Sequence, residues 1–216
     1  KMDGFALTVL EHLPYILMIV ISLPIHELAH GMVANWLGDD TAYYQGRLTL
    51  NPLAHLDLFG TISMAVFGFG WAKPVGVNPY YYKDRKKGMV LVALAGPMMN
   101  FIIAFLSIFG MGVIIKVTGG YVGEITAYVF DFLSYLFLIN VGLGTFNLIP
   151  IPPLDGSKIL GAILPQDKYF HYMQYERYGT LILMVLLYRN ILNGPLNFIR
   201  SSVSNGMWSI ASLILG

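Results

Sequence analysis

The sequence predicts an all-α polytopic membrane protein, with about four to five membrane helices and a small re-entrant β-hairpin after the first of them. Of the 216 residues, 56% are hydrophobic and only 12% are charged, whereas a soluble domain has about 25% charged residues. The mean hydropathy is +0.64. The apolar residues also form long uncharged runs, which suit a bilayer rather than an aqueous fold.

The composition excludes several classes of function. The chain has no cysteine, so disulfides, thiolate metal sites and cysteine nucleophiles are all ruled out. The formal net charge is +1, and the one dense cationic cluster, Lys83–Lys87, stands alone rather than in a basic stripe. We therefore expect no nucleic-acid partner and interpret this cluster as a topology signal.

The first long apolar segment runs from about Phe5 to Leu37, and Pro24 interrupts it. We expect one kinked helix, or a short lead-in followed by a spanning helix. The next segment, Thr41–Tyr82, is rich in Gly, Pro and aromatic residues, which favour strands and turns. Because Leu58–Trp71 is uncharged, we expect the hairpin to dip into the membrane, where protein or a wet cavity must satisfy its backbone.

The clearest span is Gly88–Ile115, an uncharged run long enough to cross a hydrocarbon core that takes about 20 helical residues. Further candidates follow at about Ile125–Leu148, Arg177–Ile191 and Ser201–Leu215. We expect a single domain over residues 1–216, with a core of about 15–165 and C-terminal membrane helices over about 170–216.

The first apolar segment contains the most specific chemical pattern, His26-Glu-Leu-Ala-His30. Histidines four residues apart lie on one face of a helix and can share a tetrahedral zinc ion. Glu27 can then act as general base toward the attacking water. Two His and one Glu are costly within hydrocarbon and usually functional there, so the pattern indicates metal-assisted hydrolysis inside a bilayer.

Lys and Arg in the connections indicate the orientation. The connection between the first two spans carries most of them, and the next connection has only Lys116. The positive-inside rule therefore places the first connection in the cytoplasm. The third span then returns to the cytoplasm, so Asp155 and the histidine motif lie on the same side of the membrane.

A catalytic zinc needs a third protein ligand and one position left for water. Asp155 is favoured, because the prolines before it break the helix and Gly156 permits a close backbone approach. The alternatives that stay open are His55, Asp57, His171 and Glu176.

His26-Glu-Leu-Ala-His30, together with Asn147-Leu-Ile-Pro-Ile-Pro-Pro-Leu-Asp-Gly156, resembles the site-two protease family of intramembrane zinc metalloproteases. Gly96-Pro-Met-Met-Asn100 is a further element of that family. The resemblance covers about residues 15–165 and points to the compact bacterial and archaeal branch, without a PDZ or CBS domain.

The resemblance implies that His26, His30 and Asp155 bind one Zn²⁺ per chain and that Glu27 activates water. It also implies that Asn147 contacts the substrate strand or helps to hold the reacting carbonyl. The expected partners are a transmembrane-segment protein substrate and the lipid bilayer, with the edge of the hairpin around Gly60–Val77 receiving the unwound substrate. The expected location is a prokaryotic cell membrane, with the active site toward the cytoplasmic side.

Other interpretations are a zinc-binding membrane transporter and an inactive membrane scaffold. A transport site needs ligands and a path, whereas a glutamate directly after the first histidine is what water activation requires. The intact motif also argues against a scaffold. Asn100 is interpreted mainly as a hydrogen-bonded cross-link between membrane helices, and His55 and Asp57 as loop-holding residues.

Overall fold

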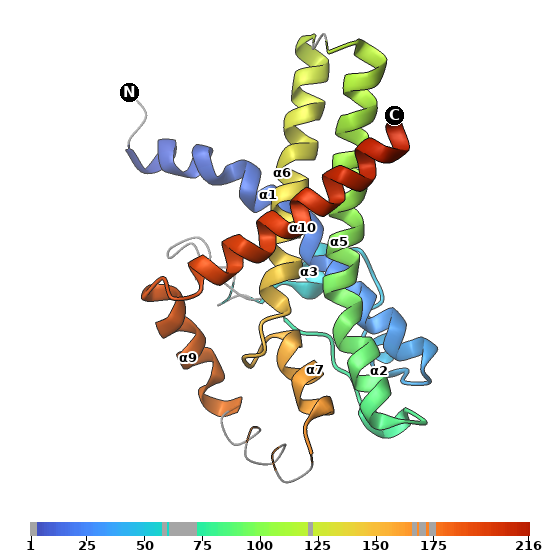
Figure 1. The fold of residues 1–216 in the computed structure, drawn as a ribbon. Coiled ribbons are helices and arrows are strands. Elements are labelled where there is room, and N and C mark those ends of the chain that lie inside the picture. The colour runs from blue at the N-terminus through green and yellow to red at the C-terminus, as the bar shows by residue number, and fades with distance from the viewer. Residues whose placement is uncertain are drawn as a thin grey trace.

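The computed structural model describes residues 4–57, 60, 73–120, 123–165, 168, 172 and 176–216, and the fold of this part is helical (Figure 1). The elements in chain order are α1 (Gly4–Trp36), α2 (Thr41–Tyr44), α3 (Pro52–His55), the 3-10 turn η1 (Pro79–Tyr81), α5 (Arg85–Thr118), α6 (Glu124–Asn147), α7 (Asp155–Ile163), α9 (Glu176–Tyr188) and α10 (Asn193–Leu215).

Within the described residues, three helical stretches are long and apolar enough to cross a membrane: Leu17–Trp36 of α1, α5 and α6. A fourth is obtained if α9 and α10, which meet at 86°, count as one broken span. The 13 residues of α9 extend about 20 Å at 1.5 Å per residue, which is too short to cross alone. The prediction of membrane helices is therefore confirmed, but three to four candidate spans in the described residues reach at most the lower limit of the four to five expected.

The expected re-entrant β-hairpin is not supported, since the described residues contain no strand. Much of the predicted hairpin, residues 61–72, lies outside the described part of the chain. The part that is described, 73–78, has an irregular backbone. The N–H of Lys73 bonds the carbonyl of His55 at 2.8 Å, and two further N–H groups of this segment bond carboxylates rather than a partner strand.

The core of the membrane domain lies between α5, α6 and α10. Figure 1 shows α5 and α6 side by side and antiparallel, with α10 crossing them. Small residues permit the close packing: a Cβ at Gly144 of α6 would lie 2.7 Å from the ring of Phe101 on α5. The buried cluster consists of Ala104, Ile108, Met111, Phe137, Val141 and Ala211.

The first helix packs against α5 through a second buried cluster, Ala34, Val92 and Tyr82. Local signals fix both ends of α5. Asp84 accepts a hydrogen bond from the N–H of Lys87 at its start, and Gly119 takes the left-handed conformation at its end, with φ of 62°. These caps fix where α5 begins and ends.

The connection after α1 is held by Asp39, which is fully buried. One carboxylate oxygen accepts from the N–H and the hydroxyl of Thr41, at 3.0 and 2.5 Å. The other accepts from the N–H of Asn78 at 2.5 Å and the hydroxyl of Tyr82 at 3.4 Å. Burial and the charge of Asp39 raise the pKa of Tyr82, so its phenol stays protonated and donates. Asp39 thereby ties the end of α1 to segment 73–78.

Replacing Asp39 with Ala should lower the free energy of unfolding in detergent by about 2–4 kcal/mol, because buried donors lose a charged acceptor. Thermal unfolding measures this. Asp40→Ala removes the same group from the adjacent exposed residue, whose carboxylate accepts from Asn35, and should cost well under about 1 kcal/mol. Equal losses in the two variants would contradict the anchoring role of Asp39.

Candidate metal centre

Two imidazoles face one another on the inner side of α1. His26 and His30 are 4% and 6% exposed, and their rings meet edge to face with centroids 4.7 Å apart. The spacing of four residues places both on one face of the helix, as predicted. Their Nε2 atoms are 3.0 Å apart, so both nitrogens point at the same small volume.

Asp155 completes the group from α7, where it is the first helical residue. Its Oδ2 lies 3.2 Å from Nε2 of His26 and 3.1 Å from Nε2 of His30. The carboxylate is therefore turned toward the histidines. Gly156 permits this approach: a Cβ there would lie 2.2 Å from the carbonyl oxygen of Leu148, as the sequence predicted.

The three atoms fit a zinc ion. Among the described residues, His26, His30 and Asp155 are the group of His and carboxylate side chains close enough to hold a metal. Their ligand atoms form a triangle with edges of 3.0, 3.1 and 3.2 Å. A zinc ion with bonds of about 2.0–2.1 Å at tetrahedral angles separates its ligand atoms by about 3.3 Å. Three protein ligands also leave a fourth position for water, as a catalytic site requires.

A glycine on α5, Gly96, leaves room beside these ligand atoms. A Cβ at Gly96 would lie 2.4 Å from Nε2 of His30 and 2.5 Å from Nε2 of His26. Any other residue at this position would displace both imidazoles. The first residue of Gly96-Pro-Met-Met-Asn100 must therefore be glycine, because the two imidazoles occupy the space that a Cβ would need.

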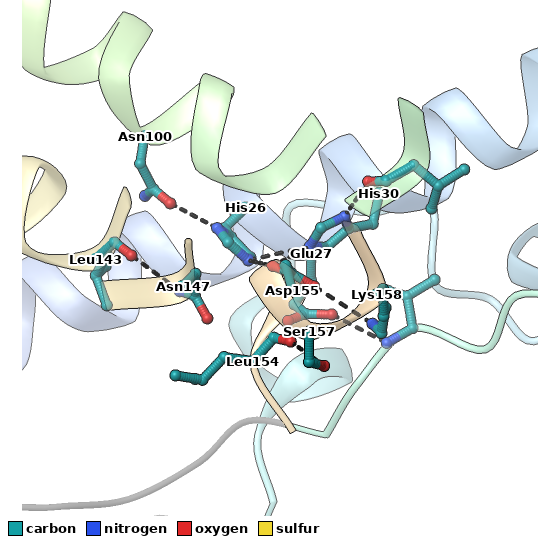
Figure 2. Close-up of polar contacts among 12 residues, drawn as sticks. His26, Glu27, His30, Asn100, Leu143, Asn147, Leu154, Asp155, Ser157 and Lys158 are labelled. Atoms are coloured by element: carbon teal, nitrogen blue, oxygen red, sulfur yellow. Dashed lines mark hydrogen bonds and ion pairs between the residues drawn. The ribbon is translucent and has the colours of Figure 1, made fainter. Parts of the chain in front are cut away.

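The remaining ring nitrogens also have partners on α5. Nδ1 of His30 lies 2.6 Å from the carbonyl oxygen of Val92, and Nδ1 of His26 lies 2.5 Å from Oδ1 of Asn100 (Figure 2). A ring that donates from Nδ1 keeps its lone pair on Nε2, which is the form that binds a metal.

The second oxygen of Asp155 faces Lys158, whose Nζ lies 3.3 Å away, one turn along α7. Burial raises the pKa of the Asp155 carboxyl, whereas the charge of Lys158 lowers it. Asp155 directs one oxygen toward the histidines and the other toward Lys158.

Glu27 is half-buried beside this group, and one of its carboxylate oxygens accepts a 2.9 Å hydrogen bond from the N–H of Val75. The other oxygen takes no part in that bond. Figure 2 shows Glu27 next to His30 and Asp155. Segment 73–78 therefore holds the Glu27 carboxylate in place.

Asn147 lies at the end of α6 and donates a 3.0 Å hydrogen bond from its side chain to the carbonyl of Leu143. Figure 2 places it on the same side of the site as His26. The amide oxygen of Asn147 takes no part in this bond. The structure thus brings Asn147 near the three candidate ligands, and its role stays a prediction.

Two of the alternative third ligands, His55 and Asp57, do not join the group. His55 is buried on α3 and donates to the carbonyl of Thr49 at 2.9 Å, and Asp57 accepts from the N–H of Gly60 at 2.8 Å. Both contacts agree with the loop-holding interpretation. His171 and the side chain of Glu176 lie outside the described residues.

A buried His-His-carboxylate set beside a glutamate, carried by apolar helices, defines a membrane-embedded metallohydrolase. Comparison with known proteins agrees. Residues 107–188 match peptidase family M50. The chain is 41% identical over 186 residues to a Bacillus subtilis (strain 168) protein, YwhC, a match that covers 86% of this chain and 85% of that one.

Two further relatives are more distant. Rip2 of Mycolicibacterium smegmatis is 29% identical over 180 residues, which cover 81% of this chain and 66% of Rip2. Like YwhC, it bears the name "Putative zinc metalloprotease". Zinc metalloprotease MJ0392 of Methanocaldococcus jannaschii is 27% identical over 177 residues, 80% of this chain and 41% of MJ0392. No solved structure matches at comparable significance.

This chain belongs to peptidase family M50, the site-two protease family. It is an integral membrane protein and a zinc metalloendopeptidase whose substrate is a protein. The expected family, enzyme class and metal are confirmed.

Gly96→Ala should lower the zinc content of the purified protein, because the added methyl group displaces the two Nε2 atoms. Elemental analysis measures this. The matched control on the same helix is Gly110→Ala, where the new Cβ meets a movable Leu133 side chain at 3.2 Å, and it should retain the metal. Full zinc in Gly96→Ala would contradict the geometry described here.

Proposed function

We propose that the enzyme hydrolyses a peptide bond in or near a transmembrane segment of its substrate. In this proposal His26, His30 and Asp155 hold one zinc ion, Glu27 is the general base and Asn147 binds the substrate. The observation that carries the proposal is the convergence of the three ligand atoms within 3.0–3.2 Å of one another.

The position of the histidines supports a substrate that lies in the membrane. His26 and His30 belong to the candidate span Leu17–Trp36, roughly 9–15 Å from its C-terminal end at 1.5 Å per residue. A helix hides its peptide groups in its own hydrogen bonds, so the substrate must unwind locally before a carbonyl reaches this depth. A metal centre at this depth acts on a peptide bond that also lies within the membrane.

The chain's own groups supply the proton transfers. Zinc, when bound, polarises the scissile carbonyl and makes water nucleophilic at neutral pH. Glu27 takes the proton of the attacking water on its free oxygen and passes it to the departing amine, while Val75 holds its other oxygen. The amide of Asn147 either contacts the substrate backbone or steadies the reacting carbonyl.

The active site faces the cytoplasmic side of a prokaryotic cell membrane in this proposal. The support is the Lys and Arg content of the connection between α1 and α5, which includes Lys83–Lys87. These residues also suit contacts with lipid headgroups. The whole of residues 1–216 then acts as one protease domain, with α1 to α7 as its core.

A transporter would use the same ligands but has no need of Glu27. The placement of Glu27 beside the ligand atoms, with one oxygen fixed by Val75, favours proton transfer instead. Membership of a peptidase family agrees with this choice.

Removing a ligand should remove the metal. His26→Ala, His30→Ala and Asp155→Ala should each lower the zinc content from about one ion per chain, because two protein ligands bind zinc far more weakly than three. Elemental analysis of the purified variants measures this. Full zinc in Asp155→Ala would exclude it as a ligand.

Glu27→Gln should keep its zinc and lose activity by several orders of magnitude, because the amide preserves the shape but takes no proton. N-terminal mass spectrometry of membrane proteins, in cells carrying the intact chain or Glu27→Gln, measures this and identifies substrates. New termini inside membrane segments are expected with the intact chain alone. Cleavage by Glu27→Gln within about tenfold of the intact rate would remove it as the base.

A further inference from the structure

Behind His26, a line of three polar side chains crosses the helix core. Nδ2 of Asn100 on α5 donates to Oδ1 of Asn140 on α6 at 2.8 Å, and Nδ2 of Asn140 donates to Oγ of Ser22 on α1 at 2.8 Å. Asn100, Asn140 and Ser22 are all fully buried. The line starts at Nδ1 of His26, 2.5 Å from Oδ1 of Asn100.

One backbone group fixes the direction of every bond in this line. Nδ2 of Asn140 also lies 2.8 Å from the carbonyl oxygen of Leu136. A carbonyl oxygen can only accept, so the side of the Asn140 amide that faces Leu136 must be the NH₂ group. The Oδ1 of Asn140 therefore faces Asn100 as an acceptor.

The orientation of the Asn100 amide then determines that Nδ1 of the His26 imidazole is a donor. Since Asn140 offers Asn100 an acceptor, Asn100 must present its NH₂ group there and its Oδ1 to His26. An amide oxygen only accepts, so Nδ1 of His26 must carry the proton. In the neutral ring, the form that binds a metal, the lone pair is then left on Nε2, 3.0 Å from Nε2 of His30 and 3.2 Å from Asp155.

We propose that Asn100 and Asn140 are positioning residues that set the tautomer of His26, and with it the affinity of the site for zinc. The proposal rests on the assignment of His26 as a zinc ligand. It gives Asn100 a role beyond cross-linking helices, and it assigns a role to Asn140, which no motif contains.

The other histidine provides an internal comparison. Nδ1 of His30 donates directly to the backbone carbonyl of Val92 at 2.6 Å. A backbone carbonyl thus sets the tautomer of His30 directly, whereas two side chains set that of His26. Substitution can interrupt the path to His26 and leave the path to His30 unchanged.

The experiment compares Asn100→Leu with Asn100→Asp. Leu removes the acceptor of His26 at similar volume, so zinc affinity, measured by competition with a chelator, should fall about 10–100-fold. Asp keeps an oxygen toward His26 and should bind zinc at least as tightly as the intact chain. Asp also loses the donor to Asn140 and adds a buried acid, so its thermal midpoint should be the lower of the two.

Two further variants test the relay itself. Ser22→Ala leaves Leu136 to fix the direction of Asn140, and should keep both the tautomer and the zinc affinity. Asn140→Leu frees the Asn100 amide to turn, and should give a mixed tautomer at His26 and weaker zinc binding.

Nitrogen NMR of the metal-free protein with labelled histidine reads the tautomer directly, and the spectrum of His26→Ala assigns the signal among the five histidines. At a pH high enough for the ring to be neutral, the intact chain should show the proton of His26 on Nδ1. A neutral ring with its proton on Nε2, or zinc affinities that follow the thermal midpoints across all variants, would overturn the proposal. Full zinc in His26→Ala would instead count against the proposed metal centre, while the tautomer result would stand by itself.

Discussion

The structure depends on one constraint: each buried histidine that offers a lone pair to a metal must place its other nitrogen against an acceptor. In the interior of a helical membrane protein, water supplies neither partner. Helix α5 supplies both acceptors within three turns: the carbonyl of Val92 accepts from His30, and the amide oxygen of Asn100 accepts from His26. Gly96 lies between them and leaves the space in which the ligand atoms meet. The site is therefore built as much by α5 as by the motif on α1.

The sequence predicted the candidate ligands because each carries a local signal. A four-residue spacing places His26 and His30 on one helical face, and a run of prolines before Asp155-Gly156 marks a chain reversal. These signals do not depend on the rest of the fold. Orientation by charge, with Gly88–Ile115 as a span, then placed the histidine motif and Asp155 on the same side of the membrane without any tertiary information.

The partners of Asn100 could not be found in the same way. Asn140 belongs to no sequence motif, and its hydrogen bonds to Asn100 and Ser22 form only when α1, α5 and α6 pack together. A buried polar side chain in a predicted span was the available signal, and it indicates a hydrogen bond without saying to which helix. Asn100 was recognised as part of a motif, yet its contact with Nδ1 of His26 depends on how α5 packs against α1.

The failure of the hairpin prediction has a physical reason in the described part of the segment. A strand needs its N–H groups for a neighbouring strand. In segment 73–78, the N–H of Val75 bonds Glu27 and that of Asn78 bonds Asp39, while Pro74 has none. Within 73–78 the Gly, Pro and aromatic pattern correctly indicated a non-helical backbone, but its donors serve two carboxylates of the α1 region. Elsewhere in Thr41–Tyr82 it was partly wrong, because the described residues include the short helices α2 and α3 and the 3-10 turn η1. The same bonds that prevent a strand in segment 73–78 fix Glu27, the proposed general base, on one side, and Asp39 anchors them at the end of the helix that carries Glu27.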